Sequence, residues 1–125
     1  MEQNFPQPDK PHVVVLSLHG NLVRHEDQQV EIMVDELLDK GHRHFIMDFD
    51  DVNFIDSAGI GLIIKLASAI EKHQGVLHLC NPQQNVQNVF NMLGIETRFQ
   101  IYTRLNRALR SVGHVLSVEF IDFAF

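Results

Sequence analysis

The chain has 125 residues, of which 45% are hydrophobic and 21% charged, and this length suits one compact domain with a single core. The net charge of -6 argues against a protein that binds duplex nucleic acid, because such a protein needs a basic face. The single cysteine, the absence of a signal-peptide pattern in residues 1–11 and the lack of an apolar run of about 20 residues predict a cytoplasmic protein with no membrane insertion.

The N-terminal part predicts an arm followed by two short strands. Residues 1–11 contain three prolines and mostly polar neighbours, so we expect a flexible arm. The β-branched run at residues 12–18 predicts a strand, His19-Gly20-Asn21 a turn, and Leu22-Val23 a second short strand. The sequence therefore predicts an N-terminal hairpin.

The rest of the chain alternates between helical and strand patterns. Glycines follow the apolar stripes of three helices, and Asn81-Pro82 and Thr103 are expected to begin the last two. Together with the first strand, the patterns predict strands at 12–18, 44–49, 76–80 and 99–102, and helices at 25–40, 57–74, 82–93 and 103–112. This order predicts a single α/β domain with a mixed, mostly parallel sheet of four to five strands, the N-terminal hairpin, and four or more helices.

The C-terminal tail, residues 113–125, has no assigned element. It holds Phe120, Phe123 and Phe125 with few charges, so we expect it to be ordered against protein surface. The surface is either the edge of the domain's own sheet or a second copy of the chain in a homodimer.

Residues 52–61, VNFIDSAGIG, are the most informative segment. A strand ends there, Asp56 and Ser57 follow, and an apolar helix begins at once. A helix N-terminus carries unpaired N–H groups and about half a positive charge, so it would stabilise a phosphate on Ser57. The alternative interpretation is that Asp56 or Ser57 only caps the helix, and that Gly59 and Gly61 only allow close packing.

The segment resembles the signature of the STAS domain of bacterial anti-sigma factor antagonists: an apolar residue, Asp-Ser, then Ser, Thr or Ala, Gly, an apolar residue and Gly. Two further stretches resemble the same family. Gly20-Asn21-Leu22 is similar to its turn after the first strand, and the stretch from Asn81-Pro82 to residues 92–95 is similar to its third helix and exit. The resemblance covers residues 12–112, with 113–125 as a C-terminal extension of the same domain.

The resemblance implies a protein without catalytic activity or cofactor. It would bind an anti-sigma factor that is also a serine kinase, and so free a sigma factor. Phosphorylation of Ser57 would end this binding and a serine phosphatase would restore it, with Asp56 and Gly59 supporting the phosphorylation site. The partner-binding residues that we expect are Leu22, Val23, Arg24, Phe54, Ile60 and Asn81. The family often has an acid where this chain has Val23, so the partner's charge requirement is expected to differ.

Two other classes of function are alternatives to this interpretation. STAS-like domains also occur as fixed subunits of lipid-transport ATPase complexes and of sensory scaffolds with no phosphoswitch, and Val23 favours such a role. For an enzyme, the sequence offers no nucleophile and base pair and no P-loop. His42 and His44 form the tightest histidine pair but lack a third ligand at a metal-binding spacing, so we expect no metal site. Cys80 is expected to be a small buried hydrophobe.

Overall fold

The computed structural model describes residues 12–24 and 28–125, so the predicted arm at 1–11 lies outside the described residues. Within this range five strands form one sheet in the order β4-β3-β2-β1-β5, and every neighbouring pair is parallel. The strands are β1 His12–Leu22, β2 His44–Ile55, β3 Val76–Cys80, β4 Ile101–Tyr102 and β5 Ser117–Ala124.

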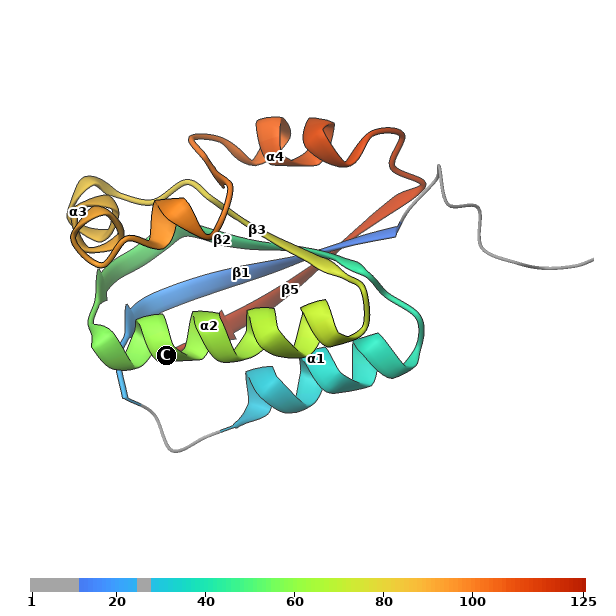
Figure 1. The fold of residues 1–125 in the computed structure, drawn as a ribbon, viewed down its shortest axis with the longest axis horizontal. Helices are drawn as coiled ribbons and strands as arrows, with labels where there is room; N and C mark the ends of the chain where they lie inside the picture. Colours follow the sequence, from blue (N-terminus) through green and yellow to red (C-terminus); the bar gives the residue numbers. More distant parts are fainter. Residues whose placement is uncertain (1–11, 25–27) are drawn as a thin grey trace, which may run out of the picture.

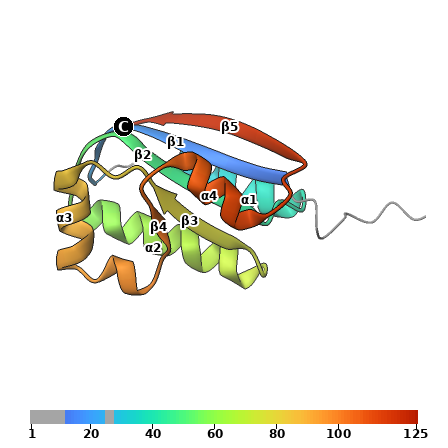
Figure 2. The ribbon, with the colours of Figure 1, turned by 90° about the horizontal axis from the view of Figure 1, so that it is seen from above.

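Helices cover both faces of this sheet. They are α1 Gln29–Asp39, α2 Ser57–Lys72, α3 Gln84–Met92, the 3-10 helix η1 Ile95–Thr97 and α4 Leu105–Val112. Helices α1 and α2 lie on one face, α4 lies on the other, and α3 lies near one end of the sheet (Figures 1 and 2). The expected α/β domain with four helices is confirmed. Within the described ranges, no helix is long and apolar enough to span a membrane.

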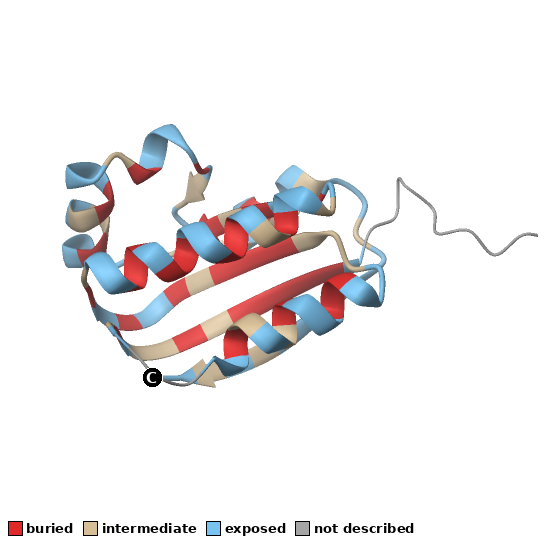
Figure 3. Ribbon diagram, turned by 60° about the horizontal axis from the view of Figure 1, so that its bottom comes forward, coloured by how far each residue is buried: buried red, intermediate tan, exposed pale blue. Residues whose placement is uncertain are grey.

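The alternation of side chains along β1 divides the core into two parts. Val14, Leu16 and Leu18 belong to the larger cluster, which includes the buried residues of α1 and α2. Val13 and Val15 belong to the smaller cluster beneath α4. Figure 3 shows that the buried residues line the sheet and the sides of α1 and α2 that face it. A strand that is buried on both faces reads as a continuous apolar run, which explains the sequence of β1.

The predicted N-terminal hairpin is wrong. β1 is one strand of 11 residues that continues through Gly20 and Asn21 to Leu22. Gly20 has a φ of +100°, and a Cβ at this position would lie 2.5 Å from the carbonyl oxygen of Phe125. Glycine is therefore needed for the close approach of the C-terminal residue, and it makes no turn.

Smaller differences concern the starts of the last two helices. The third helix begins at Gln84 and not at Pro82, because Gln83 is still extended (φ -64°, ψ 162°) and holds the capping position that was expected for Asn81. Thr103 does not cap the last helix, since Arg104 holds that position and makes no capping hydrogen bond through its side chain. The strand predicted at 44–49 continues to Ile55.

The tail forms β5, which extends the sheet beyond β1. The two strands pair without a register shift, from His12 opposite Ser117 to His19 opposite Ala124. Ile121 and Phe123 are half-buried against the larger cluster, whereas Phe120 is 59% exposed. The tail is therefore ordered against protein surface, as expected, and of the two surfaces considered it is the edge of the domain's own sheet that β5 pairs with.

Candidate functional site

The junction between β2 and α2 is held by an acidic cap. Asp56 has an extended backbone, and its Oδ1 accepts hydrogen bonds from the N–H groups of Ala58 at 2.9 Å and Gly59 at 3.1 Å. This satisfies two of the N–H groups that a helix N-terminus leaves without backbone partners. Ser57 is the first residue of α2 and is exposed. The capping role therefore belongs to Asp56, and the neighbouring Ser57 is exposed.

Gly59 allows the first turn of α2 to lie directly on the end of β1. A Cβ on Gly59 would lie 2.2 Å from the carbonyl oxygen of Leu22 and 2.7 Å from Cγ1 of Ile55. The same Leu22 carbonyl accepts a hydrogen bond from the N–H of Asp56 at 3.4 Å. Close packing at Gly59 thus fixes the position of the helix start and of Ser57 upon it.

Of the predicted partner-binding residues, two are buried and the others are at least partly exposed. Phe54 is 50% exposed, Arg24 is exposed and Val23 is half-buried. Leu22 and Ile60 are only 0% and 6% exposed because both side chains belong to the main core. These two side chains therefore cannot form a contact surface, and their prediction as such is corrected.

Asn81 serves the framework of the site. It follows β3, it is half-buried, and its Nδ2 donates a hydrogen bond to Oδ1 of Asp48 at 3.1 Å. Its backbone N–H donates to the carbonyl of Tyr102 at 2.9 Å. Asn81 therefore links the middle of β2 to the carboxyl ends of β3 and β4.

Two side-chain amides before and within α3 hold the last part of β2. The pairing of β2 with β3 ends at Asp48, so the carbonyls beyond this point have no β3 partner. Gln83 donates to the carbonyl of Asp50 at 2.9 Å, and Asn85 donates to that of Asn53 at 2.6 Å. These bonds steady the segment that leads into Ser57. Sequence reasoning missed both residues, because nothing local marks a partner about thirty residues away.

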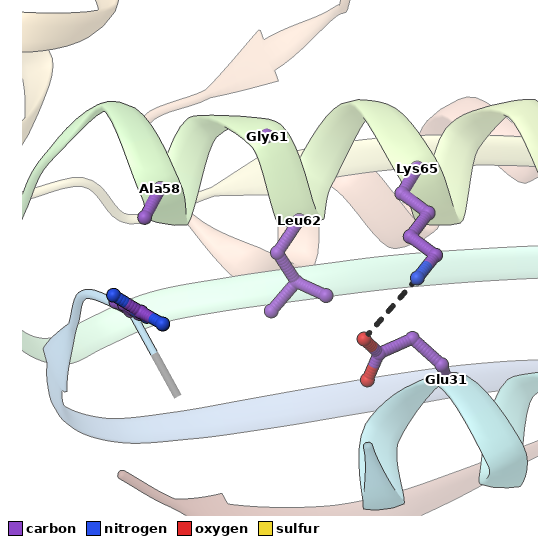
Figure 4. A pocket seen from close by; sticks show the side chains of 6 residues that line it. Glu31, Ala58, Gly61, Leu62 and Lys65 are labelled. Atoms are coloured by element: carbon purple, nitrogen blue, oxygen red, sulfur yellow. Dashed lines mark ion pairs between the residues drawn. The ribbon is translucent and has the colours of Figure 1, made fainter. Parts of the chain in front are cut away.

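A hollow of about 180 Å³ lies between α1 and the first turns of α2, and Ala58, which follows Ser57, is part of its wall. It is lined by Arg24, Glu31, Ala58, Gly61, Leu62 and Lys65 (Figure 4). Lys65 Nζ lies 3.9 Å from Oε2 of Glu31. A Cβ on Gly61 would meet nothing within 4 Å, so this glycine leaves the wall of the hollow open. Of the lining residues only Arg24 was predicted, although the spacing of Ala58, Leu62 and Lys65 places them on one helix face.

A second polar group lies on the sheet itself. The ring nitrogens of His19 on β1 lie 2.6 Å from Oδ2 of Asp51 on β2 and 2.9 Å from Oδ1 of Asp122 on β5. Hydrogen bonds to Asp122, and to a smaller extent to Asp51, raise the pKa of His19 above its ordinary value of 6.5.

Among the described residues, the remaining candidate ligands do not form a metal site. Burial raises the pKa of the Cys80 thiol to about 12, and the side chain is a buried hydrophobe as predicted. In the described part of the chain, no three His, Cys, Asp or Glu residues are grouped so that they could hold a metal ion.

Comparison with known proteins agrees with this geometry. Residues 5–108 match the STAS domain family. The chain belongs to this family. This STAS protein is 26% identical over 98 residues to the anti-sigma F factor antagonist of Paenibacillus polymyxa, across 78% of this chain and 84% of the relative. It is 28% identical over 83 residues to that of Lysinibacillus sphaericus, across 66% and 71%.

Solved structures show the same likeness. The anti-sigma factor antagonist SpoIIAA in its unphosphorylated form superposes with a TM-score of 0.65 at 25% identity, across 77% of this STAS chain and 84% of that one. The phosphorylated form of the Bacillus protein superposes with a TM-score of 0.60 at 25% identity, across 77% and 86%. The family match ends at residue 108, so β5 lies beyond the matched segment.

Proposed function

We propose that this STAS protein is an anti-sigma factor antagonist that binds, in its unphosphorylated form, an anti-sigma factor with serine kinase activity. Ser57 is the residue that the kinase modifies, and a serine phosphatase reverses the change. The observation that carries the proposal is the exposed Ser57 at the first position of α2, beside a cap formed by Asp56. The named relatives, and a structural neighbour known in both phosphorylation states, support it.

The position of Ser57 explains why the fold would tolerate phosphorylation. The phosphate would lie at the positive end of α2, where an anion is favoured. The cap and the contact of Gly59 with Leu22 do not use the serine hydroxyl. A phosphate on Ser57 is therefore expected to leave the structure of the junction unchanged.

The surface around Ser57 explains why phosphorylation would oppose binding. Phe54 offers an apolar ring that is 50% exposed, and docking must remove water from it. A phosphate adds about -1.5 to -2 charge at pH 7 and a strongly held hydration shell next to this surface. Because the cost of desolvation opposes association, the modified protein should bind weakly.

The charges that line the hollow at the start of α2 indicate which side chains a partner would present to it. Arg24 and Lys65 line it with one acid, Glu31, so the cations outnumber the acids. A carboxylate side chain of the partner would complement this surface. Arg24→Glu should therefore weaken binding more than Lys72→Glu, a charge reversal at the exposed far end of α2.

The test is phosphopeptide mapping of the full chain after incubation with ATP and each candidate kinase of this type from the same genome. The expected result is one phosphoryl group on Ser57 and none on the Ser57→Ala variant. Ser68→Ala is the matched control, since Ser68 is an exposed serine on the same helix, and it should be modified like the parent. Modification of another residue, or none with any kinase, would contradict the proposal and favour the fixed-subunit role.

A further inference from the structure

The outer edge of β5 has no role in the proposed function. Among the described residues, β5 pairs with β1 alone and forms one end of the sheet. Phe120 on this strand and Leu116 just before it are 59% and 58% exposed. A long exposed edge with apolar side chains is a template for pairing with another chain. Since it lies beyond the family match, any pairing there would be an addition to the matched domain.

One hydrogen bond shows which backbone groups point outward. The N–H of Phe125 donates to the carbonyl of His19 at 2.8 Å, and the β1 and β5 register has no shift. In a parallel pair, every second residue directs both its N–H and its C=O to the neighbouring strand. Ile121 and Phe123 therefore face β1, and the outward residues of β5 are Val118, Phe120, Asp122 and Ala124.

We propose that β5 pairs antiparallel with β5 of a second copy of this chain, about a two-fold axis at Phe120. This register places each Phe120 opposite its counterpart as a hydrogen-bonded pair. It also places Val118 opposite Asp122, and Glu119 opposite Ile121. No acid lies opposite another acid, and the most exposed ring of the strand gains an aromatic partner.

The three registers nearest to this one are less favourable. An axis at Glu119 would set two carboxylates opposite each other, and like charges in such a pair destabilise it. An axis at Ile121 would set each Phe120 opposite a charged Asp122. An axis between Phe120 and Ile121 would pair outward with inward residues and leave the ladder without hydrogen bonds.

A second copy fits the edge better than the N-terminal segment of the same chain. Residues 1–11 include Pro6, Pro8 and Pro11, which have no N–H to donate to a ladder. The outward residues of β5 include no proline, and a two-fold axis makes one such edge complementary to another.

The pairing would be weak and would leave Ser57 accessible. A single pair of strands buries less than the about 1,200–2,000 Å² of stable complexes, so the dimer should depend on concentration. Each chain carries a net charge of -6, so added salt should strengthen the association. Helix α2 packs against β2 and β3, and β1 separates these strands from β5. Each dimer would therefore present two Ser57 sites.

The first test is sedimentation equilibrium of the full chain over a concentration series at low and moderate salt. The expected result is a monomer-dimer equilibrium that Phe120→Lys weakens by about tenfold or more, because two like charges replace an apolar pair. Met92→Lys is the matched control, since Met92 is 77% exposed on α3, and it should leave the equilibrium unchanged. A monomer at every concentration, or a dimer unaffected by Phe120→Lys, would overturn the proposal.

The second test fixes the register. In a hydrogen-bonded antiparallel pair the Cα atoms lie about 5.5 Å apart, within the range of a disulfide. Phe120→Cys should therefore form a covalent dimer under mild oxidation, and Glu119→Cys should not. The native Cys80 is buried with a raised pKa and should not compete. Equal cross-linking of both variants would overturn the register, and a dimer that forms only after deletion of residues 1–11 would assign the edge to that segment instead.

Discussion

The junction at Ser57 and the strand β5 are held in different ways. At the junction, Asp56 bonds to residues two and three positions away, and Gly59 rests on the backbone of Leu22. β5 depends on pairing with β1, about 100 residues earlier in the chain, and none of its residues is fully buried. The difference teaches that the proposed recognition site combines a local cap with contacts to neighbouring elements, whereas the tail is held only by distant pairing that truncation can remove.

Removal of β5 should have the largest effect on stability. Ending the chain after Val112 removes the half-buried Val118, Ile121 and Phe123 and leaves β1 as an edge strand. Full burial of such a side chain contributes about 1.5–3 kcal/mol, so half-burial of three predicts a loss of about 2–4 kcal/mol. The measurement is urea unfolding. Phe120→Ala in the full chain is the control and should change stability by less than about 0.5 kcal/mol, and an unchanged midpoint after truncation would contradict the packing of the tail.

Two glycines of α2 have different surroundings, because Gly59 is closely packed and Gly61 borders open space. Gly59→Ala should lower the free energy of unfolding by about 2 kcal/mol or more, because the new Cβ meets the Leu22 carbonyl. Gly61→Ala, on the same helix, should raise it by up to about 1 kcal/mol, because the Cβ meets nothing and alanine favours a helix. Chemical denaturation of both variants checks this pair. Equal effects of the two changes would show that Gly59 is not a packing residue.

The cap at Asp56 should have a smaller effect. Asp56→Ala leaves two N–H groups of α2 without their acceptor, and loss of a cap costs about 1 kcal/mol. Asp56→Asn keeps an oxygen acceptor and should cost only a few tenths of a kcal/mol. Thermal unfolding distinguishes the two variants. If Asp56→Ala were as stable as the parent, the cap would not contribute to the stability of the junction.

The smallest effect concerns pH and the attachment of β5. Protonated His19 bridges Asp51 and Asp122, and its pKa in the folded protein is raised above 6.5. The stabilisation is therefore fully present below pH 6.5 and is lost as the pH rises through the folded-state pKa. Amide hydrogen exchange in β5, corrected for the intrinsic pH dependence, should show lower protection above that pKa in the parent than below it.

His19→Gln is the control for this pH effect. Burial lowers the pKa values of His44 and His78, and their contributions are lost as the pH falls, in the opposite direction. The difference between the parent and His19→Gln isolates the bridge. The same pH profile in both proteins would show that the bridge does not hold β5.

The sequence predicts where the junction lies, because the end of the strand, the Asp56-Ser57 pair and the apolar stripe of α2 all fall within about 20 residues, but it left open which of the two residues caps the helix. The same reasoning failed at Gly20, which was interpreted as a turn. A glycine that permits close approach of a distant residue, here Phe125, has the same local pattern as a turn glycine. The residue that distinguishes a close-approach glycine from a turn glycine at this position is Phe125, at the other end of the chain.

The sequence also could not predict which side chains near Ser57 are buried, or which side chains make supporting hydrogen bonds to β2. Leu22 and Ile60 flank the junction, but the three-dimensional packing directs both side chains into the core. Gln83 and Asn85 bond to carbonyls of β2, and no local pattern distinguishes them from surface amides. Long-range contacts of this kind decide which residues near Ser57 form its surface and which form its support.

The proposed switch at Ser57 is tested most directly by calorimetric titration of one kinase-type anti-sigma partner with three forms of the protein. These are the unmodified chain, Ser57→Ala and the chain fully phosphorylated on Ser57. The account predicts similar affinities for the first two and an affinity lower by roughly a hundredfold for the third. Equal affinities for the phosphorylated and unmodified forms would contradict it.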